Sequence, residues 1–471
     1  MLQAAETNDT ELLKRQLREV TEKFEKSLLE QRQMIESLRK QIEAMEQQRA
    51  ATPRTNQITP AVQPAAALAL AQPAVSAPPE SSMLTNQAWS PSQPLTLARA
   101  GSAYMNVSFG ALVDAGWSTA HDVSKELNLG DHDPIGRGFS LRNAEIALDG
   151  AVDPYFKGFA NIVFKLEKDQ STSLELEEAY LQTTSLPANL QLKAGQFFAN
   201  FGRQNPQHPH QWAFVDQPLI LTRAFGPDGL RNLGAQGSWL LPTPFYSEFS
   251  LGVLNGEGET AFNFRNQDGF GTNGLHGRPP LDRGLRGPAD FLFVPRLAGS
   301  VDITDNQTIL GGASAALGPN DSGATERTQI YGLDLYWKWK SPSAHAGFPF
   351  VSWQSEGLYS RFEAASSATP LLPAETLKDW GFYSQLLWGF KPRWVAGFRG
   401  EYVTGNAGAF DPFDVFRGER TRLSPGLTFY PTEFSKIRLQ YNYDHGQLFG
   451  VEHSVWVQLE LNLGAHGAHK F

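Results

Sequence analysis

The sequence predicts an all-β protein, a 16-stranded antiparallel transmembrane β-barrel, preceded by an N-terminal α-helical coiled coil and a Pro/Ala-rich linker. Three observations predict this architecture. Segments in which apolar and polar residues alternate recur from residue 101 to the C-terminus. The connections between these segments alternate between short and long. Residues 1–100 carry two other patterns, one helical and one rich in proline.

The composition limits the classes of protein that fit. The chain of 471 residues contains no run of 18 or more apolar residues, so no transmembrane helix is expected. Residues 1–10 show no apolar leader, which indicates either a cytosolic chain or an exported one whose leader was replaced by a start Met. Cysteine is absent, which excludes disulfides, iron–sulfur clusters and thiol catalysis. The formal charge of −9 gives no whole-chain attraction to nucleic acid.

Residues 1–50 are predicted to form a coiled-coil helix. Its apolar seam has mostly heptad spacing, with one stutter after Val20 and a polar Gln31 within it. Such a narrow stripe is better buried against copies of the same helix, so we expect an oligomer, with a homotrimer as the prediction. The alternative is a single amphipathic helix lying on the rest of the protein. The seam consists of Leu13, Leu17, Val20, Phe24, Leu28, Gln31, Ile35, Leu38, Ile42 and Met45.

Residues 51–100 are dominated by Ala, Pro, Gln and Ser. A segment with this composition cannot bury enough apolar surface to offset the entropy of ordering it. It is predicted to be an extended linker between the helix and the barrel.

Residues 101–471 are predicted to form the barrel. In the last segment the odd-numbered residues from Val455 to Leu463 are apolar, whereas the even-numbered ones from Ser454 to Asn462 are mostly polar. Successive side chains of a strand point to opposite faces, so one face of this strand is apolar. The predicted strands are 103–117, 138–152, 155–168, 173–186, 190–201, 230–242, 246–255, 291–304, 307–317, 327–340, 350–362, 377–390, 394–404, 419–431, 434–445 and 454–463.

The loop lengths and the aromatic residues indicate a membrane barrel. Short turns, such as 151–154 and 242–245, alternate with long segments, such as 202–229 and 256–290. This is the pattern of outer-membrane barrels, which have short periplasmic turns and long outer loops. Tryptophan and tyrosine residues lie toward strand ends, where interfacial girdles belong. The alternative, a soluble sandwich with a dry core, has no reason to separate its loops by length.

Residues 173–256 resemble the phosphate-selective porin O and P family. The resemblance rests on Leu176-Glu-Glu-Ala-Tyr-Leu, Leu192-Lys-Ala-Gly-Gln-Phe, Arg231-Asn-Leu-Gly-Ala-Gln and Gly252-Val-Leu-Asn-Gly, four motifs in the family's order. It continues weakly to the end of the barrel. The resemblance implies an anion-favouring, trimeric outer-membrane porin of sixteen strands. Residues 1–100 do not match the family and resemble an added module.

The candidate functional residues are cations expected in the lumen. By strand parity or loop position, Lys and Arg side chains point inward, where charged rings select ions. Arg420 and Arg422 on one strand and Lys436 and Arg438 on the next are predicted to share one wall patch. A similar number of inward acidic residues predicts modest selectivity, so a non-selective general porin remains an alternative. The candidates are Lys157, Lys165, Lys193, Arg203, Arg223, Arg231, Arg296, Arg399, Arg420, Arg422, Lys436 and Arg438.

The loop 202–229 is the predicted constriction, because it is long, follows the fifth strand and mixes cationic with aromatic residues. Its His208-Pro-His210 sequence suggests a metal site, but no third ligand is evident, so packing of the loop is preferred and no metal or cofactor is expected. No enzyme motif is present, and the chain is not expected to be an enzyme.

The predicted function is passive diffusion of small hydrophilic solutes, with a preference for anions such as phosphate-type oxyanions, through the bacterial outer membrane. The expected partners are outer-membrane lipid, small anionic solutes and two further copies of the chain. The alternative is a tether, in which residues 1–50 lie in the periplasm and contact the cell wall while the barrel serves as the anchor. No nucleic-acid partner is expected.

Overall fold

The computed structural model describes residues 94–120, 130–167, 171–266, 274–345 and 347–464. The chain divides into two compact units, Met1–Thr85 and Asn86–Phe471, and the described residues all belong to the second. The predicted coiled coil at 1–50 and the linker up to residue 93 lie outside the described residues. In the described part of the chain, no helix is long and apolar enough to cross a membrane.

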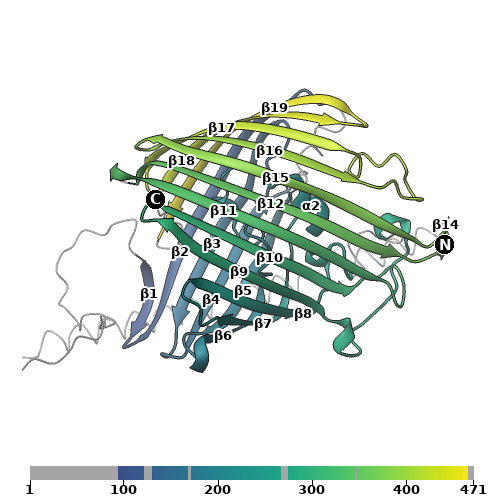
Figure 1. Ribbon diagram of the computed structural model, residues 1–471, viewed down its shortest axis with the longest axis horizontal. Helices are drawn as coiled ribbons and strands as arrows, with labels where there is room; N and C mark the ends of the chain where they lie inside the picture. The colour runs from purple at the N-terminus through teal and green to yellow at the C-terminus, as the bar shows by residue number, and fades with distance from the viewer. Residues whose placement is uncertain (1–93, 121–129, 168–170, 267–273, 346, 465–471) are drawn as a thin grey trace, which may run out of the picture. The chain divides into compact units, whose positions relative to one another are not determined.

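The described residues form a closed antiparallel barrel of sixteen strands (Figure 1). Each strand pairs with the next along the chain, and β19 pairs with β2 to close the barrel. The strands are β2 (Ala103–Ser118), β3 (Gly138–Ala151), β4 (Phe156–Leu166), β5 (Thr172–Thr183), β6 (Leu190–Phe198), β7 (Arg231–Leu240), β8 (Tyr246–Leu254), β9 (Leu292–Thr304), β10 (Gln307–Pro319), β11 (Arg327–His345), β12 (Phe348–Ala364), β15 (Glu375–Lys391), β16 (Trp394–Gly405), β17 (Arg420–Thr432), β18 (Ser435–Gly446) and β19 (Gly450–Leu463).

The predicted strand number is confirmed. Short and long connections alternate as predicted, except that only residues 447–449 join β18 to β19 at the end with the long loops. The sequence predicted a rather long connection at 341–349, where the alternation requires a short one. In the structure, β11 runs to His345 and β12 begins at Phe348. The connection is therefore a short turn like the others at that end. The remaining elements are short: the hairpin of β13 (Ser367–Ala368) and β14 (Leu371–Leu372), the helix α2 (Leu219–Phe225), and the 3₁₀ turns η2 (Pro187–Asn189), η3 (Pro209–Gln211), η4 (Glu259–Ala261), η6 (Leu275–Gly277) and η7 (Pro288–Asp290).

One further strand, β1 (Leu95–Ala100), lies in a segment that the sequence assigned to the linker. It pairs with β2, with Leu95 opposite Val107 and Ala100 opposite Ala103. The last residue of β19 lies opposite Phe109, so β1 continues along the edge of β2 where β19 stops. Six residues are too few for alternation to identify a strand, which is why the sequence did not indicate it.

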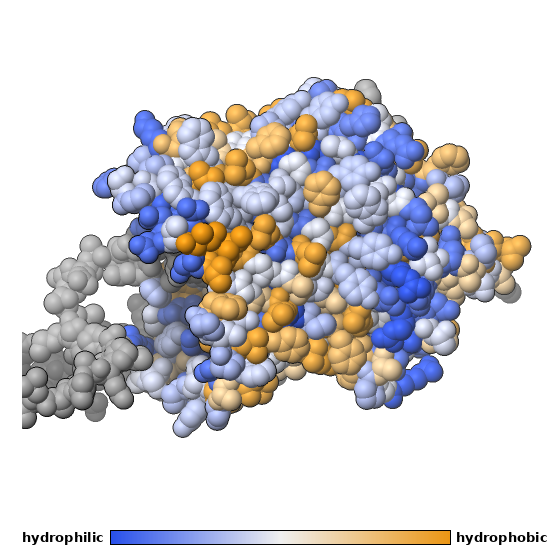
Figure 2. Space-filling view, viewed as in Figure 1, coloured by the Kyte–Doolittle hydropathy of each residue, from blue (hydrophilic) through white to orange (hydrophobic). Residues whose placement is uncertain are grey.

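The outward face of the barrel is apolar, as the alternation predicts. In β19, Leu459 and Leu461 are 50% and 56% exposed, whereas Gln458 is 3% exposed. Figure 2 shows apolar residues distributed over the outer face of the molecule. Exposed apolar area on this scale is unfavourable in water and is suited to contact with lipid. Other exposed outward residues are Phe109, Val113, Trp117, Leu192, Leu233, Leu297, Leu333, Trp380, Phe382, Trp388, Phe398 and Leu439.

The inside of the barrel is more densely packed than the open, wet lumen that the sequence predicted. The loop 199–230 folds inward, and its helix α2 lies within the barrel (Figure 1). Helix α2 packs an apolar core against one side of the wall, where β8 to β12, β15 and β16 contribute inward apolar residues. The core contains Phe197, Phe201, Leu219, Ile220, Leu221, Phe225, Leu254, Leu292, Val294, Ile330, Leu358, Tyr383 and Val403.

Candidate functional site: the inserted loop and the charged wall

The first anchor of the inserted loop holds Gly202 and Gln204 against the wall. The Gly202 N–H donates to Ser314 Oγ at 3.1 Å, and the Gln204 N–H donates to Glu356 Oε1 at 2.7 Å. Gly202 has φ +60°, and a Cβ there would lie 2.2 Å from Glu356 Oε2. Only glycine has both the conformation and the space for this close approach.

The second anchor is the carboxylate of Asp216, which reaches β16, β17 and β18 and is fully buried there. It pairs with Arg399 on β16 at 2.6 Å and with Arg422 on β17 at 2.5 Å. On β18, Gln440 Nε2 and Asn442 Nδ2 donate to it at 2.7 and 3.1 Å. A buried carboxylate with two guanidinium partners and two amide donors is compensated for its loss of water.

Between these anchors the loop backbone is held by two wall cations. Lys436 Nζ donates to the His210 carbonyl at 3.0 Å and pairs with Glu460 at 2.5 Å. One amino group of Arg438 donates to the Trp212 carbonyl at 2.7 Å. These two cations stabilise the inserted loop, so they line a packed interior instead of an open pore.

Helix α2 completes the insertion. The Leu219 N–H donates to Glu401 Oε2 on β16 at 2.7 Å, and the Phe201 and Phe225 rings meet edge to face at 4.9 Å. The helix ends at Gly226, whose φ of +83° suits a residue without a Cβ. A Cβ there would also meet the Phe262 ring at 2.5 Å.

Most of the predicted lumen cations are paired with carboxylates. Arg420 and Arg422 both pair with Asp444, at 2.8 and 2.9 Å. In the predicted patch of four cations on β17 and β18, three are therefore paired with carboxylates, and Arg438 instead donates to Gln458 Oε1 and the Trp212 carbonyl. These side chains are buried, which differs from the solvated wall that the sequence indicated. The other ion pairs are Lys165 with Asp131, Arg231 with Glu175, Arg296 with Asp334, Arg399 with Glu401, and Arg223 with Asp379.

Four predicted cations form no ion pair with a described residue: Lys157, Lys193, Arg203 and Arg438, the last of which donates to Gln458 and to the Trp212 carbonyl. Lys193 Nζ lies 4.7 Å from the centre of the Tyr180 ring, and the Arg203 guanidinium lies 3.9 Å from that of Tyr336. Lys338 and Lys340, which the sequence did not single out, share the inward parity of Tyr336 and also form no ion pair with a described residue. The sequence does indicate that these two lysines face inward, because Trp337 and Trp339 alternate with them and lie on the opposite, apolar face of the same strand.

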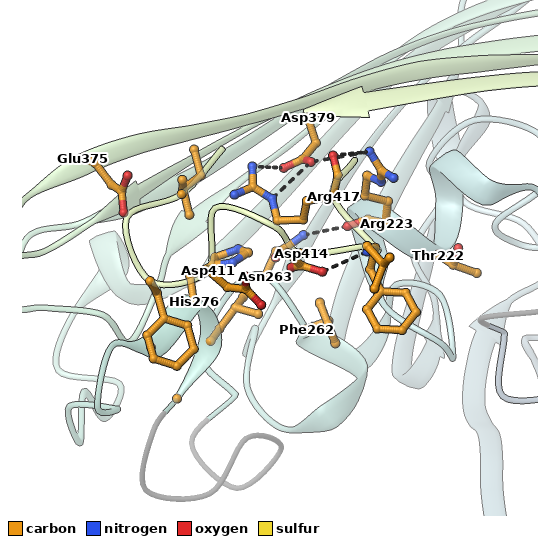
Figure 3. A pocket seen from close by; sticks show the side chains of 18 of the residues that line it. Thr222, Arg223, Phe262, Asn263, His276, Glu375, Asp379, Asp411, Asp414 and Arg417 are labelled. Carbon is orange, nitrogen blue, oxygen red and sulfur yellow. Dashed lines mark hydrogen bonds and ion pairs between the residues drawn. The ribbon is translucent and has the colours of Figure 1, made fainter. Parts of the chain in front are cut away.

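Four cavities lie around the inserted loop. On the side of the long loops are one of about 550 Å³, shown in Figure 3, and one of about 410 Å³. On the side of the short turns, cavities of about 290 and 150 Å³ share Arg203 and Gln207. None of the four is lined from both sides of the loop, so the loop separates an outer and an inner vestibule.

In the largest cavity Asp379 lies between two guanidinium groups (Figure 3). It accepts hydrogen bonds from Arg417, at 3.1 Å for the shorter one, and Arg223 lies 3.9 Å away. His276 lies in the same cavity, where burial and the charges of Arg417 and Arg278 lower its pKa to about 3. The imidazole is therefore neutral at pH 7.

A second loop, which contains Asp133, touches the inserted loop. Asp133 accepts hydrogen bonds from the Gln217 N–H at 2.8 Å and the Gly130 N–H at 2.9 Å. Burial, reinforced by the nearby charge of Asp216, raises the pKa of Asp133 to about 7. This carboxyl therefore gains a proton more readily than an exposed aspartate.

Comparisons with known proteins support this fold. No protein-family model matches the chain. The outer membrane channel DcaP of Acinetobacter baumannii has a similar structure, with a TM-score of 0.51 and 11% identity over 78% of this chain and 99% of that one. OmpTdeltaL8 of Vibrio cholerae, a loop L8 deletion mutant of the outer membrane protein OmpT, matches with a TM-score of 0.46 and 8% identity over 77% and 99%.

The likeness to DcaP extends to the porin-type barrel and not to the phosphate-selective porin O and P family, which stays a prediction. In sequence, the chain is 33% identical to an Aquifex aeolicus protein, described as an uncharacterized protein, over 357 residues. That match covers 71% of this chain and 70% of its relative. The chain, which has the fold of an outer-membrane porin barrel, therefore belongs to the same family as this Aquifex aeolicus protein.

Proposed function

We propose that this protein is a passive channel of the bacterial outer membrane, through which small hydrophilic solutes diffuse past the loop 199–230. The observation that supports it most strongly is a closed barrel with an apolar outer face and a vestibule on each side of the inserted loop. A barrel serving only as an anchor needs neither vestibule. Because the loop is anchored to both walls, the channel is narrow.

We further propose a weak preference for anions. Its basis is the part of the barrel near the short turns, where the inward-facing Lys157, Lys193, Lys338 and Lys340, and Arg203 of the inserted loop, form no ion pair with a described residue. Pore-lining charges attract ions of opposite sign and repel others. Arginine also suits oxyanions, because its planar fork donates two hydrogen bonds. The preference is weak because eight of the twelve predicted cations are paired with carboxylates.

The test is the reversal potential across a planar bilayer with a KCl gradient. The wild-type protein should show a reversal potential on the anion side, reduced in the Lys338→Gln/Lys340→Gln variant. Lys378→Gln is the matched control, because Lys378 shares the outward parity of Trp380 and should leave the potential unchanged. A wild-type potential of zero would support the non-selective general porin and overturn the anion preference.

The proposed orientation places residues 1–50 in the periplasm. Both ends of the barrel, the start of β2 and the end of β19, lie at the end with the short turns, which in outer-membrane barrels is periplasmic. The tether alternative depends on residues outside the described part of the chain. It is tested by deleting residues 1–93 and measuring envelope attachment, which would be unchanged if the helix has no tethering role.

A further inference from the structure

A second cluster of polar side chains lies where the inserted loop meets β3 and β5. It consists of Glu145 on β3, Glu177 on β5, and His208 and His210 from the loop. Each of these side chains is 5% exposed or less. One ligand atom from each of Glu145, Glu177 and His208 lies within 4.8 Å of the other two. The third and fourth ligand candidates that the sequence could not identify thus come from the wall.

The orientation of His208 is that of a metal ligand. Its Nδ1 lies 2.7 Å from Glu177 Oε2, and its Nε2 lies 2.9 Å from Glu178 Oε2. Glu178 is itself held by the Phe198 N–H, which donates to Oε1 at 3.1 Å. Histidines that bind a metal through one ring nitrogen commonly donate the other N–H to a fixed carboxylate. Glu178 supplies that partner, which leaves Nδ1 facing Glu177.

The charges of the cluster call for a cation. Among the described residues, the ion pairs of Glu145, Glu177 and Glu178 are all to histidines, namely His132, His208 and His210. None of these three carboxylates has a Lys or Arg partner among the described residues, and a bound metal cation would compensate their buried charge.

Asn161 marks the point at which these groups converge. Its Nδ2 lies 2.7 Å from Glu177 Oε2, 3.2 Å from His208 Nδ1 and 3.3 Å from Glu145 Oε2. An amide nitrogen has two hydrogens and cannot donate well to all three. The fully buried Asn161 Oδ1 has no hydrogen-bond partner among the described residues. A half turn of the amide would point Oδ1 at the same place as another oxygen ligand.

A neighbouring group of Asp131, His132, Glu175 and Asp228 differs from this cluster in its burial and in its cationic partners. Its side chains are only partly buried. Two of its three carboxylates already have Lys or Arg partners, because Lys165 and Arg142 pair with Asp131 and Arg231 pairs with Glu175. That group therefore has less need of a metal and serves as a control.

We propose that Glu145, Glu177 and His208, with His210 beside them, bind one divalent transition-metal cation of the Zn²⁺ class, which fixes the inserted loop to β3 and β5. Imidazole nitrogen combined with carboxylate oxygen suits Zn²⁺ and its neighbours, whereas Mg²⁺ and Ca²⁺ prefer oxygen alone. The four side chains are buried, so the proposed role of the metal is structural. It goes beyond the proposed channel function and does not depend on it.

The test is metal binding by the full-length protein after treatment with a chelator, with the shift of folded barrel on unheated gels as the check of folding. Wild type should bind about one Zn²⁺ per chain at this site. His208→Gln and Glu177→Gln should each weaken Zn²⁺ binding by about tenfold or more. His276→Gln, a buried histidine elsewhere, and Glu175→Gln, from the neighbouring group, should bind as wild type does. Equal Zn²⁺ affinity in all five proteins would overturn the proposal.

A second measurement uses the wild-type protein alone, so it tests the proposal even if the variants fail to fold. Co²⁺ added to the stripped protein should give visible absorption bands of a low-coordinate histidine–carboxylate site, and Zn²⁺ should abolish them in competition. Mg²⁺ in excess should not. Absence of these bands, or their loss to Mg²⁺, would show that the cluster is held by hydrogen bonds and protonated histidines alone.

Discussion

At the scale of single residues, Asp216 is the counter-charge that makes the barrel interior stable. Arg399 and Arg422 point inward by strand parity, as the sequence predicts, but their partner comes from a loop. Parity assigns a side chain to a face and cannot tell which loop residue will lie opposite it. The sequence therefore predicted the positions of these cations and not their neutralisation.

Replacing Asp216 by Asn should leave two buried guanidinium groups with one carboxylate partner each, Arg399 with Glu401 and Arg422 with Asp444. Breaking a buried ion pair on one side typically costs about 3–5 kcal/mol, so the loop should dock less firmly and the anion preference should increase. Reversal potential and single-channel conductance in planar bilayers measure both effects. Glu433→Gln, on the exposed turn between β17 and β18, is the control. Unchanged conductance and selectivity in Asp216→Asn would contradict the role assigned to this residue.

Asp133 should make the attachment of the loop sensitive to pH. Its pKa in the folded protein is about 7, above that of the unfolded chain, so its folded form holds a proton more tightly. The stability that this provides is fully present below the unfolded pKa, near 4, declines as the pH rises and is lost once the pH has passed about 7. Wild type should thus lose more resistance to proteolysis in the loop between pH 4 and 8 than Asp133→Asn does. Identical pH profiles for the wild type and Asp133→Asn would contradict the raised pKa of Asp133.

At the scale of elements, strands were predictable and the packing of α2 was not. The period of two identifies a strand wherever one face is apolar and the other polar. Around α2, however, Leu254, Val294 and Ile330 are apolar at inward positions, because they contact the helix instead of water. These inward apolar residues were a signal that something apolar fills that side of the barrel. A helix of 7 residues inside a loop has too little periodicity to be recognised from the sequence.

Phe225→Ala should loosen the inserted loop. Truncating a fully buried Phe typically costs about 3–5 kcal/mol of folding free energy. Phe225, the last residue of α2, is 1% exposed and packs against the Phe201 ring. Cleavage by a soluble protease within 202–229 should become faster, and single-channel conductance should rise. Phe413→Ala is the matched control, because Phe413 is 77% exposed in an outer loop. If both variants behave alike, α2 does not hold the loop in place.

At the scale of the whole molecule, the barrel and residues 1–93 should behave as separable parts, since the chain divides near residue 85. The homotrimer and the coiled coil remain predictions from the heptad seam. Deleting residues 1–93 should leave a folded barrel, as judged by its heat-dependent shift on gels. If the helices hold the trimer, mass measurement in detergent should show a smaller assembly for the truncated protein. A trimer of unchanged stability would assign assembly to the barrel walls.

The single-channel current of the purified full-length protein in a planar bilayer tests the central claim most directly. A barrel narrowed by an anchored loop should give discrete, small current steps that repeat from one insertion to the next. A bilayer that stays silent after folded barrels have inserted would contradict the proposal that solutes pass through this protein.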